Sequence, residues 1–210
     1  MMKNNNSNIK LFIDGFKKFQ KKHDNILEDT AYTQQPKAMM ITCCDSRIDP
    51  SLITDTKPGE LFVIRNVANL VPPFEGDLRH HGTSAAIEYG VLYLGVTDII
   101  VLGHSNCGGI ASLFSNQNKI KSSDFINNWI DIARDAKDRT LDRCKHNSQA
   151  EQINCCEKES LLISLQNLQT FPWIKDKIDK KEIYIHAWYL DLASGTIEAY
   201  NSDLKEFIPL

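Results

Sequence analysis

Short apolar runs bounded by polar turns recur along the chain and predict the strands of a sheet. The runs at 38–43, 61–65 and 98–102 are continuously apolar, which is typical of parallel strands buried on both faces. The segments 183–192 and 196–200 are joined by a short turn that contains glycine, and they predict an antiparallel hairpin.

Between these runs, apolar residues recur at helical spacing. Thr83 or Ser84 can cap a helix that ends at Gly95 and carries one apolar face, formed by Ile87, Val91 and Leu94. Further helices are expected near Cys107, over 123–138 and 150–168, and from Phe171. Alternation of strands and helices predicts an α/β fold, with a mostly parallel central sheet flanked by helices and an antiparallel edge strand.

The N-terminal segment has a different character from the rest of the chain. It predicts an amphipathic helix to about Lys22, whose apolar stripe is formed by Leu11, Phe12, Phe16 and Phe19. A single helix ahead of the first strand cannot bury such a stripe alone, so it must pack on the domain or on a partner subunit. We therefore divide the chain into an N-terminal helical arm, 1–33, and a single α/β domain, 34–210.

Composition narrows the class of protein. The 210 residues are 42% hydrophobic and 24% charged, which is typical of a globular domain and excludes disordered and collagen-like chains. The formal net charge of −3 offers no excess of positive charge for binding nucleic acid. No apolar run approaches the length of a membrane span, and no secretory signal pattern is evident, so the expected location is cytoplasmic.

Two clusters of polar and sulfur-bearing residues follow two of the predicted parallel strands. Cys43 ends the first strand, and His104 and Cys107 follow the third. Ligands bind beyond the carboxyl ends of the strands in α/β sheets, so these three side chains converge if the two strands are neighbours. Two thiolates and one imidazole, with a fourth position left open, are the ligand set of a catalytic rather than a structural zinc site.

Five segments of the sequence resemble the β-class carbonic anhydrases, and specifically their plant-like branch. The matching segments are CCDSR at 43–47, PGELFVIRNVAN at 58–69, GTSAAIEYGV at 82–91 and GHSNCGG at 103–109, with a weaker match, IHAWYLDLASG, at 185–195. The resemblance implies a zinc-dependent lyase, carbonate dehydratase, which hydrates carbon dioxide reversibly to bicarbonate and a proton through zinc-bound hydroxide.

The family also implies roles for individual residues. One Zn²⁺ per subunit would be held by Cys43, His104 and Cys107, and Asp45 and Arg47 would form a catalytic dyad beside it. In this scheme Asp45 accepts the hydrogen bond of the hydroxide, and Arg47 keeps Asp45 ionised and aimed.

The substrate pocket implied by the plant-like branch includes Gln34, Phe62 and Tyr89. In the family, part of this pocket comes from a neighbouring subunit, so we expect a homodimer or a tetramer or octamer built from dimers. Some members have a closed form in which the aspartate binds zinc, together with a bicarbonate site that uses a tryptophan. Met40 stands at that tryptophan's position, so the resemblance implies the open form.

Several other residues have two interpretations. Arg65 and Asn66 either bind an anion or tie a loop. Cys44 should point away from the metal into the core, because side chains alternate along an extended chain. The remaining cysteines could form a second metal site with His146, but their spacing is not typical of zinc, and burial on a helical face is the favoured interpretation; they are Cys144, Cys155 and Cys156.

Three rival functions remain open at this level. The same metal centre could hydrolyse another small substrate such as carbon disulfide, and a gas assay on each substrate would distinguish the two. A non-catalytic zinc-binding or sensor protein would not need the Asp45–Arg47 pair. A thiol-redox protein built on adjacent cysteines lacks the usual Cys-x-x-Cys motif.

Overall fold

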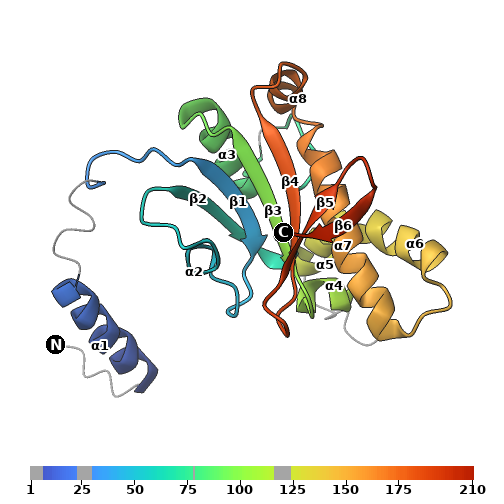
Figure 1. The fold of residues 1–210 in the computed structure, drawn as a ribbon, viewed down its shortest axis with the longest axis horizontal. Coiled ribbons are helices and arrows are strands. Elements are labelled where there is room, and N and C mark those ends of the chain that lie inside the picture. Colours follow the sequence, from blue (N-terminus) through green and yellow to red (C-terminus); the bar gives the residue numbers. More distant parts are fainter. Residues whose placement is uncertain (1–6, 23–29, 78, 116–123) are drawn as a thin grey trace.

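A six-stranded sheet forms the centre of the molecule (Figure 1). The computed structural model describes residues 7–22, 30–77, 79–115 and 124–210. The strand order is β2-β1-β3-β4-β5-β6. The first four strands pair in parallel, whereas β5 pairs antiparallel with both β4 and β6. The bounds are β1 Ala38–Cys43, β2 Leu61–Asn66, β3 Asp98–His104, β4 Tyr184–Leu190, β5 Ile197–Asn201 and β6 Glu206–Pro209. The predicted fold class is confirmed, and β6 is an addition to it.

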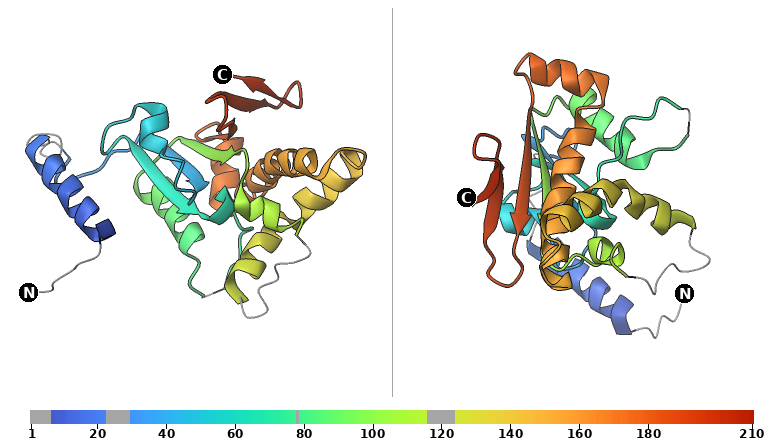
Figure 2. Two further views of the ribbon diagram at one scale, coloured as in Figure 1. Left: turned by 90° about the horizontal axis from the view of Figure 1, so that it is seen from below. Right: turned by 90° about the vertical axis from the view of Figure 1, so that its right-hand side faces the viewer.

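Helices pack mainly on one face of this sheet (Figure 2). The α-helices are α1 Ser7–Lys22, α2 Pro50–Thr54, α3 Gly82–Glu88, α4 Gly108–Ser112, α5 Asp124–Ile130, α6 Arg134–Arg143, α7 Gln149–Leu168 and α8 Pro172–Asp179. Short helical turns lie at Val67–Asn69, Tyr89–Tyr93 and Asp131–Ala133. α7 is the longest helix of the domain, and it contacts both β3 and β4 at the centre of the sheet.

The two faces of β1 pack into different apolar clusters, because side chains alternate along a strand. Met39 and Ile41 lie in the main core with residues of α3, α7 and α8. Met40 lies in a smaller cluster with Ile48 and Ile100, against which α2 packs. This burial on both faces explains why β1 was recognisable as a continuous apolar run.

Two helix predictions need correction. The helix expected to be capped by Thr83 or Ser84 begins at Gly82, and neither residue is its N-cap. That helix also widens into a single π-helical stretch at Tyr89–Tyr93, where Gly90 lies against the sheet. A Cβ added to Gly90 would lie 2.1 Å from Met39 Cε, so any other residue here would require the buried Met39 side chain to shift.

The single helix expected over 123–138 is instead a succession of α5, a 3₁₀ turn and α6. The break leaves room for Trp129 to donate from Nε1 to the Val67 carbonyl oxygen at 2.7 Å. The helix α7 begins at Gln149 behind a capping box, in which Ser148 and Glu151 satisfy each other's backbone N–H groups. Local hydrogen bonds therefore set boundaries that apolar periodicity alone did not indicate.

The N-terminal helix α1 stands apart from the sheet domain (Figure 1 and the left view of Figure 2). Its large apolar side chains are exposed, including Leu11 at 68%, Phe12 at 68% and Phe16 at 58%. The domain thus does not cover the stripe that the sequence pattern indicated.

Candidate metal centre

The carboxyl ends of β1 and β3 bring together Cys43, His104 and Cys107. The two strands pair in parallel, with Thr42 opposite Leu102, so their last residues lie side by side. Cys107 is reached by a short turn after β3 and stands directly before α4. The sulfur and nitrogen ligand atoms all lie within 4.8 Å of one another, and all three residues are buried.

The imidazole of His104 is oriented as a metal ligand would be. Its Nδ1 lies 2.9 Å from the Ser105 carbonyl oxygen, so Nδ1–H donates there and Nε2 keeps its lone pair. That Nε2 is buried, and it has no hydrogen-bond partner among the residues that the structure describes. A buried polar nitrogen without a partner is costly, and a cation bound between the two sulfurs would remove that cost. The residues present therefore fit a zinc ion.

The two thiols are already electrostatically coupled. A hydrogen bond from the Cys107 thiol lowers the pKa of Cys43 to about 4, with His104 contributing and burial opposing the shift. The same contact raises the pKa of Cys107, because a second negative charge beside the first is unfavourable. The contact thus favours the thiolate on Cys43, and a bound divalent cation would stabilise a second thiolate on Cys107.

Asp45 and Arg47 form a bidentate ion pair beside the ligand cluster. Arg47 donates from Nε to Asp45 Oδ1 at 2.9 Å and from Nη2 to Oδ2 at 2.7 Å. These hydrogen bonds hold the pKa of Asp45 well below its usual range. Asp45 Oδ2 lies 4.0 Å from His104 Nε2, so a charged carboxylate faces the ligand cluster.

Arg65 and Asn66 tie the loops around this pair. Arg65 donates from Nε to the Cys43 carbonyl oxygen at 3.1 Å and from Nη2 to the Asp45 carbonyl oxygen at 2.8 Å. The Asn66 side chain donates to the Leu70 carbonyl oxygen and accepts from the Leu70 N–H. These contacts support the interpretation that Arg65 and Asn66 tie a loop rather than the interpretation that they bind an anion.

A buried network behind Cys107 was missed from the sequence. Glu157, 3% exposed on α7, accepts the Cys107 backbone N–H at 2.8 Å and the Tyr189 hydroxyl at 2.8 Å. Asn154 donates to that hydroxyl at 2.8 Å. Burial raises the pKa of Glu157. The available signal was helical spacing, since Glu157 stands four residues before the buried Leu161.

The two aromatic residues expected in the substrate pocket lie against each other. The rings of Phe62 and Tyr89 have centroids 6.2 Å apart. Phe62 on β2 is paired with Met39 on β1. Met39 stands four residues before Cys43, which places this pair about 13 Å from Cys43 along the strand. Gln34 lies in an exposed segment that precedes β1. These residues are thus remote from the metal ligands of their own chain.

The expectation for Cys44 was wrong. Its side chain is exposed rather than in the core, because β1 ends at Cys43 and Cys44 lies in the turn that follows. Among the later cysteines, Cys156 is buried on α7 as predicted, whereas Cys144 and Cys155 are only partly buried. His146 is exposed. Within the described ranges, no group of potential metal ligands includes these residues.

Comparison with known proteins gives concordant matches. The family model described as carbonic anhydrase matches residues 38–197. Beta carbonic anhydrase 3 of Arabidopsis thaliana is 37% identical over 186 residues, covering 88% of this chain and 72% of the relative. Beta carbonic anhydrase 6, mitochondrial, of the same plant is 44% identical over 171 residues, covering 81% of this chain and 58% of the relative.

Solved structures show the same similarity at the level of the fold. The β-carbonic anhydrase CcaA superposes with a TM-score of 0.89 at 32% identity, covering 97% of this chain and 92% of that one. A tetrameric β-carbonic anhydrase of Sordaria macrospora gives a TM-score of 0.77 at 26% identity, covering 91% and 95%.

The fold and the ligand cluster define an α/β protein with a buried site that fits zinc. The matches specify which one, because the chain belongs to the carbonic anhydrase family, and its relatives are of the β class. Its activity is the reversible hydration of carbon dioxide, and its cofactor is zinc. No helix in the described ranges is both long enough and apolar enough to cross a membrane.

Proposed function

We propose that Cys43, His104 and Cys107 hold the zinc ion and that Asp45 and Arg47 are the catalytic pair. The observation that carries this proposal is the cluster of three buried ligands with a charged Asp–Arg pair at its open side. When bound, zinc lowers the pKa of a water molecule so that a nucleophile is available near neutral pH.

In this proposal Asp45 orients the nucleophile. Its carboxylate accepts a hydrogen bond from the attacking oxygen and so directs a lone pair at the carbon of carbon dioxide. The depressed pKa of Asp45 supports this role, because an ionised carboxylate can only accept. Asp45 is a hydrogen-bond acceptor here and not the terminal proton acceptor, which we assign to solvent or buffer.

Arg47 is a positioning residue for Asp45. It holds both carboxylate oxygens and also donates to the Asn106 carbonyl oxygen at 3.2 Å, which fixes the guanidinium between the two loops. The arrangement is the one expected of the open form, in which the carboxylate stays on arginine rather than on the metal. The buried Met40 at the position discussed above is compatible with it.

We propose that Gln34, Phe62 and Tyr89 serve the active site of a second subunit. The distance of Phe62 from its own Cys43 supports this assignment, as does the exposure of the neighbouring aromatic surface. Tyr89 is 45% exposed and Tyr93, stacked on it, is 75% exposed. The small, apolar substrate requires little more than such a dry wall.

A homodimer is the proposed minimal assembly, with residues 1–33 as an arm that reaches the partner and 34–210 as the catalytic domain. The exposed apolar stripe of α1 supports this arrangement, because such a face in water requires a covering surface. Replacing Phe12 with Asp should shift the sedimentation coefficient toward that of a smaller species, whereas Leu141→Asp, at an exposed apolar residue of α6 outside the arm, should not. An unchanged assembly would contradict the role of the arm.

We propose a cytoplasmic location. The six free cysteines support a reducing compartment. One relative is described as mitochondrial, and the mitochondrial matrix is also reducing. Fractionation of cells that express the natural protein distinguishes the two compartments.

The decisive experiment measures zinc content and the rate of carbon dioxide hydration on the same sample. Purified protein should contain about one zinc per chain and accelerate carbon dioxide hydration in a stopped-flow indicator assay, with little turnover of carbon disulfide. Zinc-loaded protein without carbon dioxide hydration would instead favour a zinc-binding or sensor role.

A further inference from the structure

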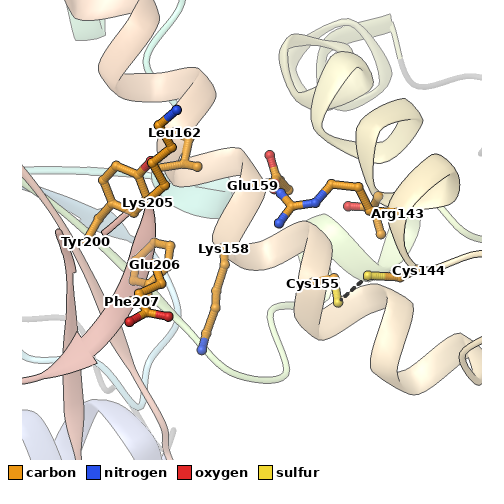
Figure 3. A pocket seen from close by; sticks show the side chains of 11 residues that line it. Arg143, Cys144, Cys155, Lys158, Glu159, Leu162, Tyr200, Lys205, Glu206 and Phe207 are labelled. Carbon is orange, nitrogen blue, oxygen red and sulfur yellow. Dashed lines mark hydrogen bonds and ion pairs between the residues drawn. The ribbon is translucent and has the colours of Figure 1, made fainter. Parts of the chain in front are cut away.

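A second pair of thiols lies far from the metal ligands in the sequence and has no assigned role. Cys144 is the C-cap residue that directly follows α6, and Cys155 stands in the second turn of α7. Their sulfur atoms are 2.8 Å apart, and both cysteines are free (Figure 3). The two side chains point toward each other from neighbouring helices.

This geometry is close to that of a disulfide. A bonded sulfur pair is about 2.05 Å apart, so the two atoms need to approach by less than about 1 Å. Cys144 is held in place on both sides: its N–H donates to the Thr140 carbonyl oxygen at 2.8 Å, and its carbonyl oxygen accepts from Gln152 Nε2 at 3.2 Å. These contacts fix the backbone of Cys144 beside α7.

The pair is accessible to a small reagent. It borders a cavity of about 230 Å³ between α6, α7 and the β5–β6 hairpin (Figure 3). Two of its lining cations are engaged in ion pairs, Arg143 with Glu159 and Lys158 with Glu198. The two sulfurs are the nucleophilic thiols of this lining.

The two thiols differ in their readiness to react. Burial, with the contact to Cys144, raises the pKa of Cys155 to about 11, so this sulfur stays protonated at neutral pH. Thiol–disulfide exchange requires a thiolate as the attacking group. The first attack therefore belongs to Cys144, and Cys155 is the resolving thiol.

We propose that Cys144 and Cys155 are a redox modification site that forms a reversible disulfide by exchange with a low-molecular-weight disulfide of the glutathione type. The Cys144 thiolate attacks one sulfur of the reagent, whose S–S bond breaks and releases one thiolate that takes up a proton. The Cys155 sulfur then attacks Cys144, its proton passes to solvent, and the second reagent thiolate leaves and is protonated. In total, two protein thiols and one disulfide become one protein disulfide and two free thiols.

The cross-link connects the α6–α7 loop to α7, the helix that also carries Glu157. Closing this loop restricts the unfolded chain and stabilises the native one, so the melting temperature should rise by about 5 °C. The stability of the enzyme would then respond to the thiol–disulfide balance of its surroundings, without use of the zinc ligands.

The test uses the zinc-loaded full chain, reduced, freed of reductant and then exposed to graded ratios of oxidised to reduced glutathione. The expected product has lost two hydrogen atoms and two free thiols, has kept its zinc and melts at a higher temperature, and dithiothreitol reverses the change. After trypsin digestion, the dipeptide 144–145 should be linked to the peptide 146–158.

The second peptide contains both Cys155 and Cys156, so matched variants identify the partner. Cys155→Ser should abolish the cross-link and the rise in melting temperature, and Cys156→Ser should retain both. If Cys155→Ser does not fold, the loss of the link in Cys144→Ser makes the same test. A wild-type protein that gains only glutathione adducts, a link that persists in Cys155→Ser, or oxidation that instead joins Cys43 to Cys107 with loss of zinc would each overturn the proposal.

Discussion

The chain places two close pairs of cysteines in two different environments. Cys43 and Cys107 lie buried at the carboxyl ends of parallel strands, together with an imidazole whose free nitrogen faces them. Cys144 and Cys155 lie half-exposed between two helices, beside groups already engaged in ion pairs.

The difference shows that the neighbours, and not the sulfur atoms, decide what a pair of thiols does. In the first pair, burial and a third neutral ligand favour a cation that neutralises two thiolates. In the second pair the described part of the chain offers no third ligand, and access from solvent favours bonding between the sulfurs themselves. Three experiments on residues in and around these pairs follow, from the largest expected effect to the smallest.

The largest effect should come from exchanging one sulfur for oxygen in each pair. Cys107→Ser should lose zinc and reduce the carbon dioxide hydration rate by about a thousandfold or more, because no metal then lowers the pKa of water. Cys144→Ser should keep both zinc and rate. Metal analysis with stopped-flow assays decides, and an active, metal-free Cys107→Ser would exclude the proposed mechanism.

A smaller effect should come from Asp45→Asn, which alters the group beside the metal and leaves the ligands intact. Zinc should stay bound, and kcat should fall by about a hundredfold, because an amide cannot reproduce the accepting geometry of an ionised carboxylate. The matched control is Asp49→Asn, four residues further on, where asparagine caps α2 as well as aspartate does. Loss of zinc in Asp45→Asn would assign Asp45 a structural role instead.

The smallest effect concerns the buried Glu157 behind Cys107. Its raised pKa means that the folded state binds more protons than the unfolded state above pH 4.5, so its contribution to stability falls as pH rises toward the folded pKa. Glu157→Gln lacks this titration and keeps an oxygen that can accept from Cys107 N–H. From about pH 5 to about pH 8, the melting temperature of the wild type should therefore fall relative to that of the variant. A constant difference would contradict the pKa assignment.

Strong periodicity explains the successful part of the sequence-based prediction. The run at 38–43 coincides with β1, since a strand buried on both faces must be continuously apolar. The neighbouring β3 extends two residues beyond the predicted 98–102, and this brings His104 to the end of a strand. The preference of zinc for thiolate and imidazole ligands then identified Cys43, His104 and Cys107, which the structure brings together.

Features decided by distant contacts were not predictable in this way. The first turn of α3 gave no unambiguous cap, so its N-cap was misplaced by two or three residues. The exposure of Cys44 depends on what lies above the end of β1, and the partnership of Glu157 with Cys107 joins positions fifty residues apart. The short β6 was missed because it is mostly exposed at the sheet's edge.

The amino-acid sequence by itself determined the parallel strands and the chemical nature of the zinc ligands. Burial of a strand and the preference of zinc for certain ligands both depend on residue type and local spacing. Only the tertiary structure decided that Cys144 lies against Cys155 and that Glu157 supports Cys107. Those relations depend on how helices α6 and α7 are placed against each other and against the sheet, which is set by packing over the whole domain rather than by any single segment.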